Sequence, residues 1–254
     1  MEGKEISMEN NFIYRSYEWC FEKYIIEGLN HEEMALEANT TKRTIEKWCT
    51  EKHRLTQKYR QQNKELSKIQ RDLIIGSMLG DGHIDNRTKQ PIFIVSHSEI
   101  QKDYLYWKYN ILKDLCNKEP SIIEEKDKIF DNKIYKSKKA YRLCTRIYDC
   151  LLEIRDMSVI ELLDNLNKFS FSILILDDGY RDNRGLWQYC IAPYSKEEID
   201  YMIKIFKEKF NIEGYIKETD ERYLKFRKND SIIIDKIILK NIPNNLDIIK
   251  YKIL

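Results

Sequence analysis

Two short apolar stretches that look like versions of each other constrain the fold of this chain more than any other feature. Leu73–Gly82 and Ser170–Gly179 each run through apolar residues into an acidic residue followed by glycine. One such stretch predicts an ordinary helix whose glycine closes it in the left-handed conformation. Two of them, one small domain apart, instead predict two related half-domains. Their final carboxylates, Asp81 and Asp178, are then expected to meet, and two like charges in contact need a divalent cation between them.

Both stretches resemble the LAGLIDADG motif of homing endonucleases. Ile74–Gly82 follows the nine-residue pattern with Gly76 and Gly80 at its small positions, and Phe171–Gly179 follows it with fewer small residues. In that family the two motif helices pack side by side, and their final acidic residues bind the metal ions that cut DNA. The resemblance therefore implies a metal-binding role for the last aspartate of each stretch.

The order helix, two strands, helix, two strands, helix is predicted twice from residue 69 onward. The two half-domains are expected at residues 69–168 and 169–254. In the first, one continuous strand is predicted over 134–144, followed by a helix over 147–154. The fold class is α+β: two pseudo-symmetric α-β-β-α-β-β-α halves with antiparallel DNA-binding sheets, plus a small all-α N-terminal domain.

Residues 1–68 are expected to form that N-terminal domain together with a basic linker. Helices are predicted over 12–27, 31–38 and 41–53, with Asn30 and Thr41 as N-caps. The layout resembles a helix-turn-helix of the resolvase or homeodomain-like kind.

The third of these helices carries exposed basic residues, Lys42, Arg43 and Lys47, which suit a recognition helix in a major groove. The alternative is a small helical domain whose basic face is merely solvated. The linker over 54–68 is also basic, and it is expected to follow phosphates without reading bases.

Composition supports a nucleic-acid-binding protein through local rather than total charge. The net charge is only +2, yet ten Lys and Arg stand against three Glu between Lys42 and Arg71, and Lys133–Arg146 holds six basic residues and no acidic one. The six cysteines form no C-x-x-C pair, which argues against a zinc site and favours reduced thiols. With no membrane-length apolar stretch and no signal peptide, a soluble cytoplasmic protein is expected.

Phosphodiester hydrolysis needs an activated water and neutralisation of the charge that builds up around phosphorus. Asp81 and Asp178 are the expected catalytic metal ligands, holding two or three divalent ions. Mg²⁺ suits this role because it prefers oxygen ligands and keeps several waters, with Mn²⁺ as a substitute. The resemblance adds the backbone carbonyls of Gly80 and Asp177 as ligands. The Asp177 side chain is itself expected to be structural or to lie behind the ligands.

One basic residue per half is expected near the cleavage centre, as in single-chain members of the family. Arg155 lies 74 positions after Asp81, and Lys252 lies 74 positions after Asp178. Their role would be to polarise the attacking water or to stabilise developing charge. The alternative for Lys252 is a solvated terminal lysine, and Arg155 cannot serve as a base. The four histidines show no ligand spacing and are not expected to form a site.

Strand residues are expected to read the DNA, because a twisted antiparallel ribbon fits a major groove and presents alternate side chains to base edges. The candidates in the first half are Arg87, Lys89, Lys133, Lys136, Lys138 and Arg142. Those in the second half are Arg181, Arg184, Gln188, Lys225, Arg227 and Lys228. Each one alone is more simply a solvated charge; the group is favoured because its members fall on predicted strands of both halves.

The resemblance implies a monomeric, Mg²⁺-dependent, sequence-specific double-strand DNA endonuclease with a long quasi-symmetric target. Such a protein belongs to a mobile element, here intron-encoded or free-standing, in a bacterial, phage or organellar compartment that holds DNA. One alternative is a non-cleaving DNA-binding regulator on the same fold, against which the retention of Asp81 and Asp178 argues. The other is an RNA maturase that helps a host intron splice, which no residue excludes.

Overall fold

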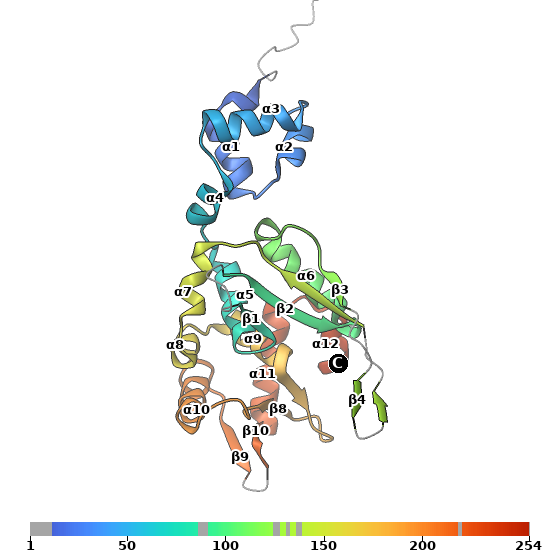
Figure 1. Cartoon of the computed structure of the whole chain (residues 1–254). Coiled ribbons are helices and arrows are strands. Elements are labelled where there is room, and N and C mark those ends of the chain that lie inside the picture. Colours follow the sequence, from blue (N-terminus) through green and yellow to red (C-terminus); the bar gives the residue numbers. More distant parts are fainter. Residues whose placement is uncertain are drawn as a thin grey trace, which may run out of the picture. The chain divides into compact units, whose positions relative to one another are not determined.

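The structure is a computed structural model that describes residues 12–85, 91–123, 128–130, 133–135, 139–217 and 220–253. The chain forms two compact units (Figure 1). The first comprises the chain up to Glu65 together with Ile147–Cys150, and the second comprises Leu66–Arg146 and Leu151–Leu254. Within the described residues, no helix is both long enough and apolar enough to cross a membrane.

The first unit consists of short helices around a small apolar core. In chain order its segments are η2 (Ile13–Arg15), α1 (Tyr17–Phe21), η3 (Glu22–Ile26), α2 (His31–Glu37), α3 (Lys42–Glu46), η4 (Lys47–Lys52) and α4 (Gln57–Asn63). The predicted caps are confirmed. The Asn30 side chain accepts hydrogen bonds from the N–H groups of Glu32 and Glu33 at the start of α2. Thr41 accepts one from the N–H of Thr44 at the start of α3, so both helices begin where the sequence predicts.

The basic linker is partly fixed to this unit by two of its own cations. The guanidinium of Arg60 is buried and donates hydrogen bonds to the carbonyls of Gly28 and Leu29. The ammonium of Lys64, also buried, donates to the carbonyl of Ile26. Because these charges are used inside the protein, the expectation that the whole linker follows phosphates is wrong for Arg60 and Lys64.

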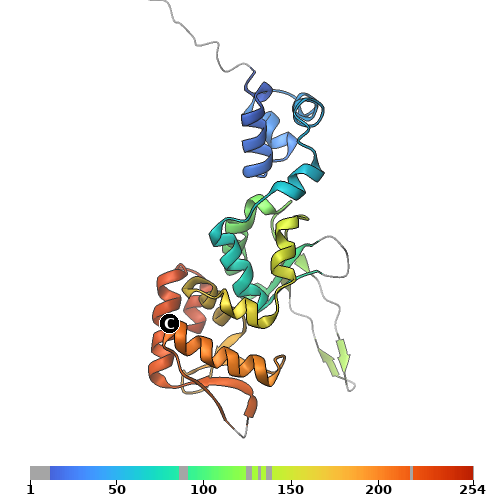
Figure 2. The same ribbon diagram turned by 90° about the vertical axis from the view of Figure 1, so that its left-hand side faces the viewer.

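The second unit contains both predicted halves apart from Ile147–Cys150. The first half has α5 (Lys68–Met78), β1 (Gly82–Ile84), β2 (Phe93–Ser98), η5 (Glu99–Gln101), α6 (Lys102–Leu112), η6 (Lys113–Leu115), β3 (Ser121–Ile123), β4 (Lys128–Phe130), β5 (Lys133–Tyr135), β6 (Ala140–Cys144), α7 (Leu152–Arg155) and α8 (Val159–Asp164). The second half, drawn toward the red end of the colour scale in Figure 2, has α9 (Lys168–Asp178), β7 (Gly179–Arg181), β8 (Trp187–Cys190), α10 (Lys196–Phe210), β9 (Gly214–Lys217), β10 (Asp220–Phe226), α11 (Lys228–Asn241) and α12 (Asp247–Lys252).

The two halves have the same sheet topology, which confirms the predicted α+β fold class. The first sheet has the strand order β1-β2-β6-β3, and the second has the order β7-β8-β10-β9. Every neighbouring pair in both sheets is antiparallel. In each sheet, the spatial order is thus the first, second, fourth and third strand in chain order.

The structure differs from the prediction at two places in the first half. The strand expected over 134–144 is interrupted, because β4 and β5 form a separate two-stranded hairpin before β6 begins. Helix α8 was not predicted, although its start carries a capping box: Ser158 and Glu161 each accept a hydrogen bond from the other's backbone N–H.

Helices α5 and α9 pack directly against each other in the second unit (Figure 1). A Cβ atom added to Gly76 would lie 2.4 Å from the carbonyl oxygen of Ser170 and 2.8 Å from the Cβ of Ile173. One added to Gly80 would lie 2.5 Å from the Cβ of Asp177. The two motif helices are therefore side by side, as the resemblance implies, with the glycines of α5 against bulkier residues of α9.

The glycines that end the two motifs serve packing rather than a left-handed cap. Gly179 has φ −79° and ψ 148°, and among the described glycines only Gly28 and Gly185 have positive φ. A Cβ on Gly179 would lie 2.4 Å from the carbonyl oxygen of Ile175. A Cβ on Gly82 would lie 2.9 Å from Phe93. Glycine is needed at both positions because strand and helix approach too closely for a side chain.

Candidate functional site

The C-terminal ends of α5 and α9 bring the two motif aspartates into one electrostatic environment. Asp81 follows α5, with 34% of its side chain exposed, and Asp178 is the half-buried last residue of α9. Burial first, and then the negative charges of Asp81 and Asp177, raise the pKa of Asp178 to about 6. A carboxylate held beside like charges is a site that a cation would stabilise.

Lys252, the basic residue predicted for the second half, is buried against the end of α9. Its ammonium donates hydrogen bonds to the carbonyls of Leu176, at 2.6 Å, and Gly179, at 2.7 Å. A cation at the C-terminus of a helix satisfies carbonyls that have no partner in the helix and opposes its dipole. Burial lowers the pKa of Lys252 to about 8, although Asp177, Asp81 and Asp178 act in the opposite direction. The alternative of a solvated terminal lysine is excluded.

The end of α5 is held differently. The hydroxyls of Tyr189 and Tyr194 both donate to the carbonyl of Leu79, at 2.6 and 2.7 Å. Leu79 occupies the same motif position as Leu176. At this motif position the carbonyl of the first helix therefore accepts from two neutral hydroxyls, whereas that of the second accepts from the Lys252 ammonium.

Arg155, the basic residue predicted for the first half, has another partner. Its guanidinium forms an ion pair with Asp156 at 2.7 Å. Among the contacts of the described residues, none joins Arg155 to Asp81 or Asp178. The equal spacing of 74 residues therefore identified a group beside the acids in one half and not in the other.

The side chain of Asp177 is completely buried, and both of its oxygens accept hydrogen bonds. Its oxygens accept hydrogen bonds from the ammonium of Lys108, at 2.7 and 2.8 Å, and from the hydroxyl of Tyr104, at 3.0 Å. Lys108 also donates to the hydroxyl of Ser77 at 3.0 Å, and burial lowers its pKa while the Asp177 carboxylate opposes that effect. These contacts support the structural role expected for this carboxylate and leave only its backbone carbonyl as a candidate ligand.

His97 belongs to the site, and the expectation that no histidine does so is wrong. Its ring is completely buried, with Nδ1 3.2 Å from Oδ2 of Asp81 and Nε2 3.8 Å from Oδ1 of Asp177. It lies on the buried side of β2 with Phe93 and Val95. The only local sign of it in the sequence is a polar residue in the inward register of a strand beside the motif, and this sign does not show what the residue contacts.

Asp81, His97 and Asp177 each offer one ligand atom within 4.8 Å of the others. A cation bound by all three would lie beside the ammonium of Lys108, which already contacts both oxygens of Asp177. The repulsion disfavours an ion there. Asp81 and Asp178 fit a hard cation better, because their oxygens face like charge without a cation bonded to either carboxylate in the described residues.

The outward face of the second sheet carries several of the predicted DNA contacts. Along β10, Leu224 and Phe226 are buried, so Lys225 points to the opposite face. It pairs across the strands with Gln188 and Tyr215. Gln188 is covered by Tyr180, whose hydroxyl donates to its side-chain oxygen at 2.9 Å. Arg227, which follows β10, lies over the ring of Tyr215 at 5.8 Å.

Arg181 is a structural residue rather than a base-reading one, which corrects the prediction. It stacks on Trp187 at 4.9 Å and donates to the Asp235 carboxylate and to the carbonyls of Gly185 and Lys252. Each of its three guanidinium nitrogens therefore already donates to a group of the protein.

The other predicted contacts fall into two sets. Lys42, Arg43, Lys47, Arg142, Arg184 and Lys228 are exposed. Of these, Lys42 pairs with Glu32 and Arg184 pairs with Asp182, both at 2.7 Å, and Arg142 donates to Ser96 at 3.3 Å. Arg87, Lys89, Lys136, Lys138 and the Lys133 side chain lie outside the described residues.

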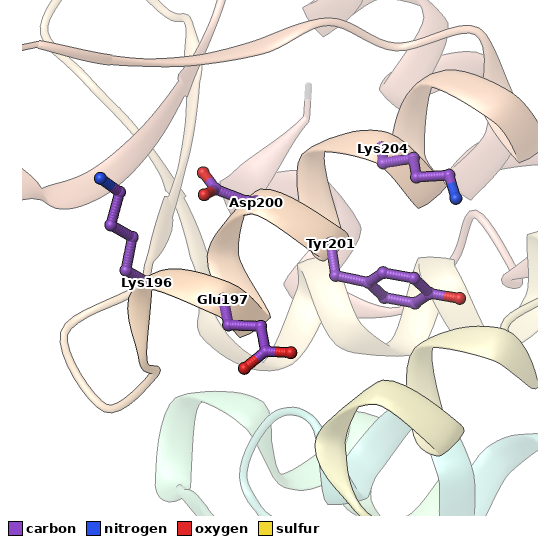
Figure 3. A pocket seen from close by; sticks show the side chains of 5 residues that line it. All are labelled: Lys196, Glu197, Asp200, Tyr201 and Lys204. Carbon is purple, nitrogen blue, oxygen red and sulfur yellow. The ribbon is translucent and has the colours of Figure 1, made fainter.

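A surface pocket on α10 shows no chemistry of its own (Figure 3). Its walls come from that one helix and mix both charges: Lys196, Glu197, Asp200, Tyr201 and Lys204. The hydroxyl of Tyr201 is already donated to Asp164 at 2.6 Å. The chemistry of the second unit is therefore concentrated at the ends of α5 and α9.

The fold and the paired acidic motifs define a LAGLIDADG protein. The chain belongs to the LAGLIDADG DNA endonuclease family, whose sequence model matches residues 71–233. It is similar to the cytochrome b mRNA maturase bI2 of Saccharomyces cerevisiae, with 27% identity over 203 residues that cover 71% of this chain and 46% of that protein. The chain thus spans about half the length of this relative.

Its fold is similar to that of the homing endonuclease I-WcaI, whose structure was solved bound to its DNA recognition sequence. The TM-score is 0.63 with 20% sequence identity, and the match covers 75% of this chain and 88% of the other. At this identity the likeness defines the fold and no individual residue role.

Proposed function

We propose that the protein is a site-specific double-strand DNA endonuclease that uses divalent metal ions held by Asp81 and Asp178. The observation that carries the proposal is the placement of these two carboxylates at the ends of packed helices, where burial and then the charges of Asp81 and Asp177 raise the pKa of Asp178. In a regulator that does not cleave DNA, two carboxylates that repel each other would serve no function. The paired halves within one chain support action as a monomer on a quasi-symmetric target.

Each group near the acids has a role in this proposal. Asp81 and Asp178, with the backbone carbonyls of Gly80 and Asp177, would hold Mg²⁺ or Mn²⁺. When bound, such ions activate a water and stabilise the charge of the phosphodiester transition state. Lys252 fixes the end of α9 and adds a positive charge close to the scissile phosphates. Arg155 has no part in it.

DNA binding is assigned to the exposed faces of the two sheets and to the first unit. Lys225 and Arg227 stand on the outward face of the second sheet among tyrosines, and Arg142 stands on that of the first. Basic side chains contact phosphates, and alternate residues of a strand reach base edges. The exposed cations of α3 suit a second region of major-groove contact.

The test is metal-dependent cleavage. Purified protein is incubated with genomic DNA of its source in Mg²⁺ or in EDTA, and the DNA ends are sequenced to find recurrent breaks. We expect breaks at one or a few sites in Mg²⁺ and none in EDTA. Asp81→Asn and Asp178→Asn should abolish them while leaving DNA binding intact. Tight binding with no nick under any metal condition would contradict the endonuclease.

A second candidate function is assistance to RNA splicing, favoured by one finding: the similar yeast protein is an mRNA maturase. In that case the protein would act on the intron that surrounds its own gene. The discriminating measurement is the splicing rate of that transcript with and without protein. If the Asp81→Asn variant still raises the splicing rate, splicing depends on a surface other than the one formed by the two aspartates.

A further inference from the structure

We propose that His97 is a positioning residue for Asp81, and that it makes the two cleavage half-sites unequal. This inference rests on the proposed endonuclease function and concerns how that site is built. It predicts that the two DNA strands respond differently when the His97 side chain is changed.

The contact itself is the first support. Nδ1 of His97 lies 3.2 Å from Oδ2 of Asp81, and the histidine side chain is completely buried while the carboxylate is 34% exposed. Neither ring nitrogen makes an aligned hydrogen bond within the described part of the chain, so the approach of Nδ1 to Asp81 is a close contact without that alignment. Nδ1 has no competing partner there and is available to hold Oδ2 of Asp81.

The second support is the rigid base behind His97. Its ring packs against Tyr104 at 5.1 Å, and its Nε2 faces Asp177. Asp177 is in turn fixed by two contacts from Lys108. Asp177 comes from the second motif, whereas Lys108, Tyr104 and His97 belong to the first half. The second motif thus supplies the carboxylate that braces the first half's histidine.

Room for this arrangement comes from the first motif. Gly80 stands at the motif position that Asp177 occupies in the second, and any side chain there would collide with Asp177. The equivalent network cannot form in the second half, because Gly80 has no carboxylate that could contact residues there. The difference between the two halves therefore results from one pair of equivalent positions, Gly80 and Asp177.

Strand register identifies the residue that replaces His97 in the second half. Gly82 pairs with Val95 across β1 and β2, and Gly179 pairs with Tyr189 across β7 and β8. Two residues farther along the second strands are His97 and Ile191. Ile191 is buried and apolar, so Asp178 has no equivalent partner and instead lies near Lys252.

Outer groups that orient metal ligands typically change activity or metal affinity by about 10- to 100-fold when they are removed. We therefore expect His97→Ile, which installs the residue of the second half, to slow one nick by roughly this factor. The other nick should change much less. His97→Gln retains a polar group in the same place and should recover part of the loss.

The activity test measures the two nicks separately on a plasmid that carries the target with each strand labelled. Ile191→Val is the matched control, because it alters the equivalent buried position without touching a polar contact. It should leave the ratio of the two nicking rates unchanged. Equal slowing of both strands by His97→Ile would overturn the inference and leave the endonuclease proposal intact.

A second readout needs neither DNA nor metal. The chain has four histidines, so the side-chain nitrogen signals of His97 in labelled protein can be assigned with His97→Ile. Asp81→Asn should shift these signals, whereas Asp178→Asn should not. An unmoved His97 in Asp81→Asn would refute the contact. If the wild type cuts no DNA, this measurement still decides the positioning role while the endonuclease proposal fails.

Discussion

The buried ion pair between Lys108 and Asp177 is the residue-scale feature on which the site depends. Both side chains are completely buried, and the pair joins α6 of the first half to α9 of the second. Taking two charges out of water costs free energy that a good geometry only partly offsets. The pair is therefore better explained by the position it gives to neighbouring groups than by the stability it contributes.

We expect Lys108→Met to lower the free energy of unfolding by about 3–5 kcal/mol, because it leaves the Asp177 carboxylate buried without a cation. The double variant Lys108→Met with Asp177→Asn removes both charges and should recover much of this loss. Urea denaturation of the wild type, both single variants and the double variant measures the coupling. Additive effects of the two substitutions would show that the pair is not coupled in solution.

Asp178 should reduce stability in the absence of metal. Its folded-state pKa is raised to about 6, so the stabilisation from its protonated form is full at low pH and is lost as the pH rises through about 6. In EDTA above neutral pH, Asp178→Asn should melt higher than the wild type. About 1 kcal/mol would raise Tm by roughly 2–4 °C in a chain of this size.

Thermal melts of wild type and Asp178→Asn over a pH series test this. The two curves should converge below the ordinary pKa of an aspartate and separate as the pH rises toward 6. Adding Mg²⁺ should stabilise the wild type more than the variant, because only the wild type keeps both carboxylates. A wild type that melts higher than Asp178→Asn in EDTA at every pH would contradict the expectation.

The sequence was sufficient to find Asp81, Asp178 and Lys252, because a motif and its spacing define them along the chain. It was not sufficient for His97 and Lys108. Their roles depend on Asp177 crossing from one half into the other, and no local pattern records a contact over that sequence distance. For Arg155 the sequence predicted a role that the structure does not support. Its spacing from Asp81 equals that of Lys252 from Asp178, but its guanidinium pairs with Asp156.

At the scale of elements, the packing of α5 on α9 is the contact that places both acids. Gly76→Ala should destabilise the second unit by about 1–3 kcal/mol, because the new methyl group would collide with the Ser170 backbone. Gly185→Ala is a useful comparison, since nothing lies within 4 Å of its added Cβ and only its φ of +75° opposes the change. We expect this second substitution to cost about 1 kcal/mol.

Urea denaturation of the two variants measures these costs, and the cleavage assay adds a functional readout. Gly76→Ala should also reduce cleavage, because separated helices would separate the acids. Gly185→Ala should leave cleavage unchanged. Equal stability losses with full activity in both would mean that the helix pair tolerates a wider spacing than the structure shows.

Most elements were predictable because each half repeats strong local signals, such as the capping boxes at Ser195 of α10 and Ser67 of α5. The hairpin of β4 and β5 was not. It interrupts the repeat in one half only, and strands as short as Lys128–Phe130 and Lys133–Tyr135 give little alternation to detect. The repeat itself therefore favoured one continuous strand there.

At the scale of the whole molecule, the question is what the first unit contributes to DNA binding. Arg43 of α3 and Lys47, the first residue of η4, are exposed, while the linker cations Arg60 and Lys64 are used internally. The number of phosphates that a protein neutralises sets the slope of log affinity against log salt concentration, by about 0.9 per contact for duplex DNA. This slope therefore counts the contacts of a chosen set of cations.

We expect the full chain carrying Arg43→Gln and Lys47→Gln to bind target DNA with a slope reduced by about 1–2 units. The matched control carries Lys196→Gln and Lys204→Gln on α10, which removes the same charge from a face with no predicted DNA contact. A smaller slope with unchanged preference for target over random DNA would assign α3 to phosphates. A loss of that preference would assign it to base reading, because base contacts alone carry sequence information. Identical slopes in both variants would remove α3 from the DNA interface.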